Sequence, residues 1–516
     1  MPDSPICYPD WWFSDWWREW LSHGKFVPGD VRIFFGSPYF WQELNYAIPL
    51  YISGLAVAYF LRGRGVSLAS SYGAGLLLAF CGYWCTLFSA GHGSWFILMT
   101  YVIFPFGLLD RAIRKDKLKN WLLLGATIGW AGYWQPDLWL LFLLLIGVYF
   151  VYRCVCQRRF PWKGMMLAAV AMFAVGSAGF YGAVFRDLGS RDKQIAESRG
   201  TSLAGGAAAA TNDDERWVFV TNWSLPPDET AEFFVPRING DTSCPMTLSL
   251  GVQHGTGVRP YTGALGRPMG AVQGNYRQHS LYVGWVTCLL ALVGLLSFFW
   301  RRGDGARPWR KDILFFAIAA AVCWLFSLGR YCEPVYRMIF SLPFGDYLRA
   351  PVKWHHLTEF SLVVLAGFGL ELVFSLICRA GRNCCCATLA VAGIVLLGAW
   401  DLARVDRLYC APVDLREARR QKASLQMTFL RQSDFSNPQV SALVKAKRIV
   451  PLANPRPDVY LVGVLEPYKR EDKSLPPLSF PAGLSILAMI ATVGIGVYAG
   501  LDACGHVRSG RFLACR

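Results

Sequence analysis

Three sets of polar side chains in this sequence have the types and the spacing that chemistry would need. The carboxylates of Asp3, Asp10 and Asp15 lie near the N-terminus, beside a tryptophan-rich stretch. Such a carboxylate can act as a general base that takes the proton from an attacking hydroxyl group. A second pair, Asp228 and Glu229, could orient substrate hydroxyl groups or hold a divalent metal. The alternative for this pair is structural, because carboxylates in the first turn of a helix stabilise its dipole.

The third set is cationic. Arg349 and Lys353 lie in Leu348-Arg-Ala-Pro-Val-Lys353, just before a long apolar stretch. Arginine can bind a phosphate through two parallel hydrogen bonds, and lysine can bind it as a point charge. The pair therefore predicts a clamp for a lipid phosphate, with ordinary snorkelling to headgroups as the alternative. His92, in Gly91-His92-Gly93, is a further candidate for substrate binding, with a structural role in a tight outer turn as its alternative.

Membrane helices must position these residues. The chain has 516 residues, of which 54% are hydrophobic and only 17% charged, and its mean hydropathy is +0.31. Soluble proteins carry charge on roughly a quarter of their residues. The composition therefore excludes a soluble enzyme and a disordered protein, and it indicates an all-α polytopic membrane protein. The net charge of +16 is explained by basic cytoplasmic loops, so we expect no nucleic-acid partner.

Eleven apolar segments are predicted to cross the membrane, because about 20 helical residues span the bilayer core. They are 44–61, 67–90, 94–110, 120–134, 137–152, 164–185, 281–300, 312–328, 356–377, 384–402 and 479–501. Gln135, Pro136 and Asp137 separate the fourth from the fifth. We therefore predict a tight helical hairpin at this turn.

Every second short connection is rich in lysine and arginine, which predicts a cytoplasmic C-terminus by the positive-inside rule. Helices one to six then occupy 44–185, helices seven to ten 281–402, and the last helix with its cytoplasmic tail 479–516. Four long segments face outward, namely 1–43, 186–280, 329–355 and 403–478. In the first, Trp11 to Leu21 predicts an interfacial helix. In the second, Ser224 is expected to cap a helix whose first turn holds Pro226, Pro227, Asp228 and Glu229. The last is predicted to form a small α/β segment, and function is expected at the outer face.

The 16 cysteines do not form a metal motif. Most lie in or beside the predicted helices, where cysteine behaves as a small apolar residue. Cys7, Cys244, Cys332 and Cys410 are expected to face outward, and four cysteines allow three disulfide pairings. No CxxC pair occurs, so we expect no structural zinc site.

Several stretches together resemble the bacterial YfhO family of membrane proteins, which are glycosyltransferases of the GT-C superfamily. The similar stretches are Trp223-Ser-Leu-Pro-Pro-Asp-Glu229 running to Pro236, Gln278-His-Ser-Leu-Tyr-Val-Gly284, Leu328-Gly-Arg-Tyr331, Leu348-Arg-Ala-Pro-Val-Lys353 and Leu365-Ala-Gly-Phe-Gly369. Each stretch is short. Their order and their places in the predicted topology are similar to the family over residues 1–400.

The resemblance implies a GT-C-like helix bundle that moves a sugar from a polyprenyl-phosphate donor to a cell-envelope glycan or lipid acceptor. It places the chain in the bacterial cytoplasmic membrane with its active face outward. An acidic catalytic residue is implied in the first outer loop, where Asp3 lies. The family also has a membrane helix before this loop, so we expect the present chain to lack that helix.

In the implied reaction, Asp3 is the general base, and Arg349 and Lys353 hold the leaving phosphate. A single displacement would invert the anomeric centre. Glu229 would orient acceptor or sugar hydroxyl groups. The scheme needs no cofactor, and a divalent metal at Asp228 and Glu229 stays open.

Two other functions are alternatives to the glycosyltransferase. A flippase or transporter of a lipid-linked substrate would be expected to show inverted repeats and ion sites near the membrane midplane. The sequence has no internal repeat, and acidic residues within the predicted helices are few, with Glu359 and Glu371 on the ninth. The other rival is a truncated, non-catalytic envelope-assembly protein, which the expected loss of a first helix would favour.

Overall fold

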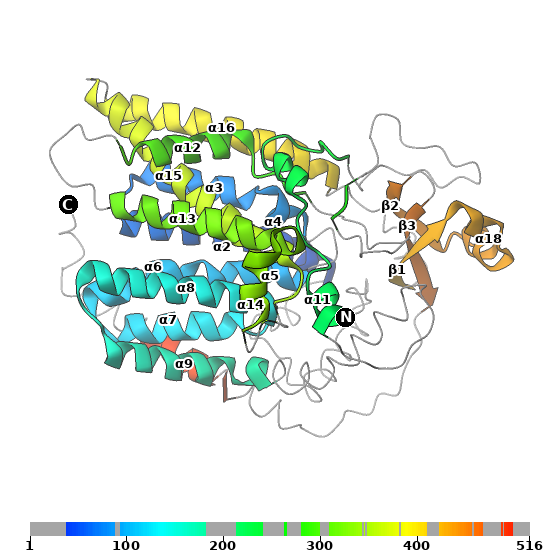
Figure 1. Ribbon diagram of the computed structural model, residues 1–516, viewed down its shortest axis with the longest axis horizontal. Coiled ribbons are helices and arrows are strands. Elements are labelled where there is room, and N and C mark those ends of the chain that lie inside the picture. The colour runs from blue at the N-terminus through cyan, green and yellow to red at the C-terminus, as the bar shows by residue number, and fades with distance from the viewer. Residues whose placement is uncertain are drawn as a thin grey trace.

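A computed structural model places most of the described residues in helices that lie side by side in one bundle (Figure 1). The residues that the structure describes are 38–87, 93–181, 213–240, 263–265, 280–299, 309–342, 345, 348–380, 383–409, 423–456, 459–467, 487–488 and 490–498. Asp3 and His92 lie outside these ranges, as do Cys7, Cys244 and Cys410.

The first six predicted membrane segments each contain described helices. These are α2 (Pro38–Gly63), α3 (Leu68–Ala79), α4 (Gly82–Thr86), α5 (Gly93–Val102), α6 (Phe104–Lys115), α7 (Leu118–Ala131), α8 (Pro136–Gln157) and α9 (Trp162–Tyr181). Pro105 lies in the first turn of α6, where proline lacks only a hydrogen bond that the first turn cannot make, so the chain restarts a helix there. The predicted hairpin around Gln135–Asp137 is confirmed, because α7 ends at Ala131 and Pro136 opens α8.

The C-terminal part holds longer helices and several single turns. They are α11 (Asp213–Val220), η3 (Pro227–Phe233), α12 (Trp285–Leu296), α13 (Arg310–Ser327), η4 (Gly329–Cys332), α14 (Glu333–Phe340), η6 (Pro351–Trp354), α15 (His355–Arg379) and α16 (Cys384–Tyr409). Residues 487–488 and 490–498 are also helical.

Several helices are suited to cross a bilayer. Among the described residues, four helical stretches are long and apolar enough, namely Trp95–Lys115, Pro136–Gln157, Pro351–Arg379 and Cys384–Asp406. A fifth is added if α13 and the following Gly329–Phe340 count as one bent span. The chain is therefore a helical polytopic membrane protein, and the number of eleven spans stays a prediction.

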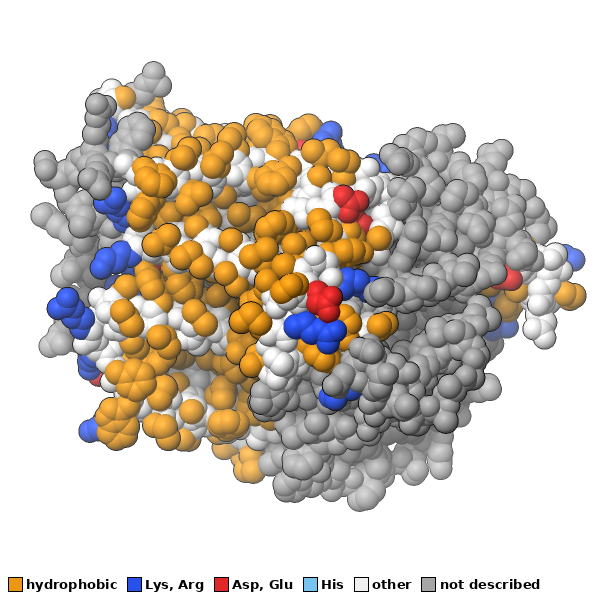
Figure 2. Space-filling model, viewed as in Figure 1, with side chains coloured by type: hydrophobic (Ala, Val, Ile, Leu, Met, Phe, Trp, Pro, Cys, Tyr) orange, Lys and Arg blue, Asp and Glu red, His pale blue; other side chains and the backbone are white. Residues whose placement is uncertain are grey.

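The outer surface of the bundle is apolar where lipid would cover it. Large hydrophobic side chains stand exposed along single helix faces, such as Val148 and Val151 on α8 and Leu289, Leu292 and Leu296 on α12. In Figure 2 hydrophobic side chains cover the flank of the bundle, and lysine and arginine side chains line its left margin. A soluble monomer rarely exposes so large an apolar patch, so this flank is the lipid-facing belt.

The basic residues at one end of the bundle enclose a buried charged network. Asp110 in the middle of α6 and Asp312 at the start of α13 are 1% and 0% exposed. Both contact Arg64, which follows α2, and Arg153 of α8. Burial lowers the pKa of Arg64, but acidic groups led by Asp312 act against it, and the net shift is upward. Its guanidinium therefore stays charged. We call this end, formed by 62–66, 110–117, 153–162 and 309–312, the basic end.

Glycines allow a close crossing of α12 and α15. A Cβ atom built on Gly294 of α12 would overlap the carbonyl oxygen of Leu365, and one on Gly369 of α15 would overlap that of Leu290. The two backbones therefore touch, as small residues permit in membrane helices. This crossing attaches α12 to α15, the helix that directly follows the predicted phosphate clamp.

Gly369→Ala should therefore destabilise the bundle by about 1–3 kcal/mol, the usual range for overpacking. Thermal unfolding of the purified protein in detergent, followed by circular dichroism, measures this loss. Gly393→Ala is the matched control, because Gly393 lies on α16 and a Cβ atom added there would have nothing within 4 Å. Gly393→Ala should be neutral or stabilising, since alanine favours helix over glycine. Equal melting temperatures for the two variants would contradict the close crossing.

The predicted outer segment 403–478 contains a small sheet. Strands β1 (Ala423–Arg431), β2 (Ile449–Arg456) and β3 (Val459–Pro467) pair antiparallel in the order β1-β3-β2. The turn η7 (Gln432–Ser436) and helix α18 (Pro438–Lys445) connect β1 to β2. Pro451 lies on the edge strand β2, at a shift in its pairing with β3, where a missing N–H is tolerated.

Candidate functional site

Four of the stretches that carry the family resemblance meet at the end of the bundle opposite the basic end. The backbone N–H of Leu225 donates to Ser327 O at 2.8 Å, that of Val352 to Trp223 O at 2.8 Å, and that of Val283 to Phe233 O at 3.2 Å. Segments far apart in sequence thus share one hydrogen-bonded layer. We call this end, formed by 135–137, 220–240, 280–284, 328–342 and 348–354, the site end.

Arg330 and Gly329 lock this layer together. The Arg330 guanidinium donates to the carbonyl oxygens of Thr221 at 3.1 and 2.7 Å and of Asn222 at 2.7 Å. Gly329 has φ +50°, and a Cβ there would overlap Ser224 Oγ. This backbone conformation and this lack of space both require glycine. The short Leu328-Gly-Arg-Tyr331 motif is therefore explained by packing at the site end.

Lys353 is buried beside a carboxylate from the predicted hairpin. Its side chain is 2% exposed and forms an ion pair with Asp137 at the start of α8. The Lys353 Nζ also lies 4.5 Å from the ring centre of Trp95 on α5, a cation–π distance. Asp137, at 17% exposure, reaches the surface. The pair thus joins α5, α8 and the turn before α15, and the Asp137 carboxylate stays partly exposed.

Arg349 adds a second cation to the same place. Its side chain is exposed, and it lies close enough to act electrostatically on both Asp137 and Lys353. We call Arg349, Lys353 and Asp137 together the cationic mouth. A cluster that contains two cations is a candidate for binding an anion such as a phosphate. The predicted clamp residues therefore lie together, with Asp137 between them as an unexpected partner.

Behind the Lys353 pair lies a fully buried cluster of polar side chains. His355, His356 and Glu359 on α15 are 0%, 0% and 1% exposed. Glu359 Oε1 lies 3.7 Å from His355 Nε2 and accepts a hydrogen bond from the Tyr83 backbone N–H at 3.2 Å. The Tyr83 ring packs against His356 with ring centres 4.4 Å apart. Ionisable residues within membrane helices are costly and commonly functional, so this cluster belongs to the candidate site.

Glu229 has a bonding role that its local sequence does not indicate. It is fully buried, and its Oε1 accepts hydrogen bonds from the backbone N–H groups of Ala264 at 2.7 Å and Leu265 at 3.1 Å. The side chain therefore ties η3 to a segment 35 residues later. Asp228 is exposed beside it. Among the described residues no three His, Cys, Asp or Glu side chains converge as a metal site would need.

The expected cap by Ser224 is wrong. Pro226, not Ser224, precedes η3, and no side chain caps that turn. The Ser224 hydroxyl instead donates to Thr221 O at 2.7 Å and accepts from the Arg330 N–H at 3.0 Å. The reason is that Pro227 occupies the first position of η3, where a missing N–H leaves less for a cap to satisfy.

A tyrosine secures the start of α12 at the site end. The Tyr282 hydroxyl donates to Asp401 Oδ2 of α16 at 2.5 Å. Tyr282 is buried, so water does not compete for this bond. Because the Gly82 N–H donates to Tyr282 O at 2.8 Å, the described part of the Gln278–Gly284 stretch, 280–284, also fixes the start of α4.

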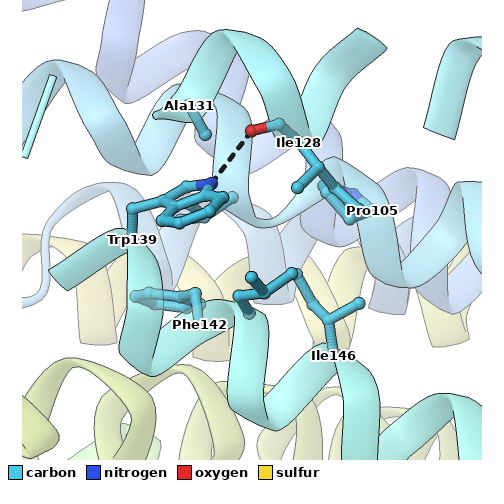
Figure 3. A pocket seen from close by; sticks show the side chains of 8 residues that line it. Pro105, Ile128, Ala131, Trp139, Phe142 and Ile146 are labelled. Carbon is cyan, nitrogen blue, oxygen red and sulfur yellow. Dashed lines mark hydrogen bonds between the residues drawn. The ribbon is translucent and has the colours of Figure 1, made fainter. Parts of the chain in front are cut away.

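A narrow apolar gap lies between α7 and α8. Figure 3 shows Trp139 and Phe142 of α8 facing Ile128 and Ala131 of α7, with Pro105 of α6 beside them. The Trp139 indole N–H donates to Ile128 O at 2.9 Å, so the ring is held across the gap. The gap is too narrow to hold even a water molecule, so these side chains form part of the packed interior of the bundle.

Three members of this site do not stand out in the sequence as functional residues. There, Asp137 belongs to a turn, Trp95 to a predicted span, and Glu359 is an isolated acid. The available signal is weak: an aspartate beside a proline at a hairpin, and two histidines followed by a glutamate on one apolar helix. No protein-family model, curated protein or solved structure matches the chain. The site is therefore interpreted from its own geometry.

Proposed function

We propose that the chain is an integral-membrane glycosyltransferase that moves a sugar from a polyprenyl-phosphate donor to a cell-envelope acceptor at the outer membrane face. One observation carries the proposal. Lys353 and Arg349 form a cationic mouth with Asp137, and this mouth lies in the layer where the family-like stretches meet. A phosphate leaving group needs such cations, because its developing charge must be stabilised.

The chain's own residues would divide the reaction as follows. The acceptor hydroxyl loses its proton to a carboxylate as its oxygen bonds to the anomeric carbon, and the bond from that carbon to the phosphate oxygen breaks. Lys353 and Arg349 hold the departing phosphate. Asp137 orients the Lys353 ammonium for this contact with the phosphate. Asp3 stays the proposed base, and it lies outside the described residues.

The position of Lys353 supports a lipid-linked donor rather than a soluble one. Lys353 lies in the first turn of Pro351–Arg379, a stretch long and apolar enough to cross the membrane. A phosphate held there would lie at the membrane surface, where its hydrocarbon chain can stay in lipid.

The proposal predicts sugar transfer by the purified protein in lipid nanodiscs. With a panel of polyprenyl-phosphate hexoses and mixed envelope lipids as acceptor, we expect release of polyprenyl phosphate at a turnover of about 1 s⁻¹ or more. The product should carry the inverted anomeric configuration, read by NMR. Chelation of divalent metals in a parallel sample tests whether transfer needs a metal ion held by Asp228 and Glu229.

Two outcomes would overturn parts of this proposal. Transbilayer movement of the donor without any sugar transfer would replace the transferase by a flippase. Neither transfer nor movement with any donor would leave a non-catalytic assembly role. Asp3→Asn tests the base separately: unchanged turnover would exclude Asp3 as the base while leaving the transferase class intact.

A further inference from the structure

The short helix α14 leaves the bundle at the place where the lipid-facing belt ends. Before it, α13 exposes Leu314, Ile318 and Val322 along one face, at 49%, 54% and 37% exposure. The four-residue spacing marks a single stripe toward lipid. The chain then bends by 108° between α13 and α14. Because α13 runs across the bilayer, a helix bent this far must run along the membrane surface (Figure 1).

Helix α14 and Leu342, two residues after its end, together present three faces. Tyr336 and Ile339 point into the protein and are buried. Met338 and Leu342, four residues apart, are 70% and 51% exposed. Beside them the Arg337 guanidinium pairs with Glu333 at 3.0 Å and is 41% exposed. A helix bathed only in water would gain nothing from exposing a methionine and a leucine on one stripe, whereas a charged face beside an apolar one is typical of helices at a membrane interface.

We propose that α14 is an interfacial helix bound to the lipid leaflet at the site end, with Met338 and Leu342 inserted below the headgroups. Phospholipid is the occupant that fits, because α14 directly follows the lipid-facing helix α13 in the chain and Arg337 complements anionic headgroups. The inference goes beyond the proposed transferase function. It needs only that the bundle spans a membrane.

This contact would also set the depth of the cationic mouth. On the inner face of α14, the buried Tyr336 hydroxyl donates to Leu348 O at 2.6 Å. The backbone N–H of Gly345 donates to Leu342 O at 2.8 Å, and that of Leu348 to Gly345 O at 3.1 Å. Leu348 directly precedes Arg349. Lipid that holds Met338 and Leu342 therefore holds the Arg349–Lys353 segment at headgroup depth.

Photocrosslinking to lipid tests the proposal directly. A benzophenone amino acid is placed at position 338 or 342 in the full chain, which is reconstituted in nanodiscs of phosphatidylethanolamine and phosphatidylglycerol. Irradiation followed by mass spectrometry should yield lipid adducts about tenfold above those from position 442. Ala442 is a suitable control because it is exposed on α18, in the predicted outer segment. Position 292 on the lipid-facing side of α12 is the positive control.

The yield of lipid adducts at different positions along the helix is a second, independent test. Position 333 on the charged face should give fewer lipid adducts than 338 and 342, since it points toward water and headgroups. Each variant is accepted only if it elutes as the wild type does in size-exclusion chromatography. Adducts at 338 and 342 that join two protein chains would overturn the proposal in favour of a dimer contact. Lipid adducts no more frequent than at 442 would overturn it outright.

Discussion

Replacement of Asp110 by asparagine should lower the free energy of unfolding by about 3–5 kcal/mol, because it removes one partner from a buried ion network. Asp110 Oδ1 lies 3.0 Å from Arg64 Nη1 and 2.6 Å from Arg153 Nη2. Its other oxygen lies 2.8 Å from Arg114 Nε. Asparagine keeps the shape of the side chain and removes only the charge. The variant therefore measures electrostatics rather than packing.

The large effect follows from how the charges balance. Arg64 and Arg153 are 7% and 5% exposed, and the buried carboxylates that face them are Asp110 and Asp312. Without Asp110, two buried guanidinium groups share the single carboxylate of Asp312. Removing a charge partner in a buried site leaves an uncompensated charge, which costs more than the pair itself contributed.

Asp116→Asn is the matched control for this prediction. Asp116 lies on the same side of the bundle, at the end of α6, and pairs with Arg159. That pair is open to water, with exposures of 38% and 51%. A surface pair contributes less than about 1 kcal/mol. Denaturation in detergent should therefore separate the two variants clearly, and equal losses would show that the Asp110 network is not what holds the basic end together.

The helices could be predicted from the sequence because each depends on a local apolar run. The segment predicted at 137–152 is α8, Pro136–Gln157, and the segment predicted at 384–402 lies in α16, Cys384–Tyr409. A run of apolar residues needs no distant partner to become a helix in a membrane, since every backbone group bonds within the helix. The bend between α13 and Gly329–Phe340 could not be predicted in this way, because it depends on packing against other helices.

The polar contacts could not be predicted in the same way, because each joins residues far apart in the chain. Lys353 and Asp137 are 216 residues apart, and Arg64 and Asp312 are 248 apart. The sequence around one residue of such a pair does not indicate which distant residue is its partner. Glu229 illustrates the limit: the sequence places it in the first turn of a short helix, as the structure has it, but its bonds to 264–265 decide what its carboxylate does.

The Lys353–Asp137 pair gives the prediction that separates function from architecture. Lys353→Met should lower sugar transfer about 10²–10³-fold, comparable to loss of one charge-stabilising donor in an active site. It should also destabilise the protein, because Asp137 then lies partly buried without its cation. Asp137→Asn should destabilise it too, by leaving the Lys353 ammonium buried and uncompensated.

The double variant Asp137→Asn/Lys353→Met decides between the two roles. It removes both charges, so its stability should return toward that of the wild type, with a coupling energy of about 0.5–3 kcal/mol. Its transfer activity should stay as low as that of Lys353→Met, since no ammonium remains for the phosphate. Lys163→Met is the control: Lys163 also lies beside an indole, 5.6 Å from the ring centre of Trp162, but at the basic end. Recovery of both stability and transfer in the double variant would make the pair purely structural, and the phosphate would then have to be held by Arg349 without Lys353.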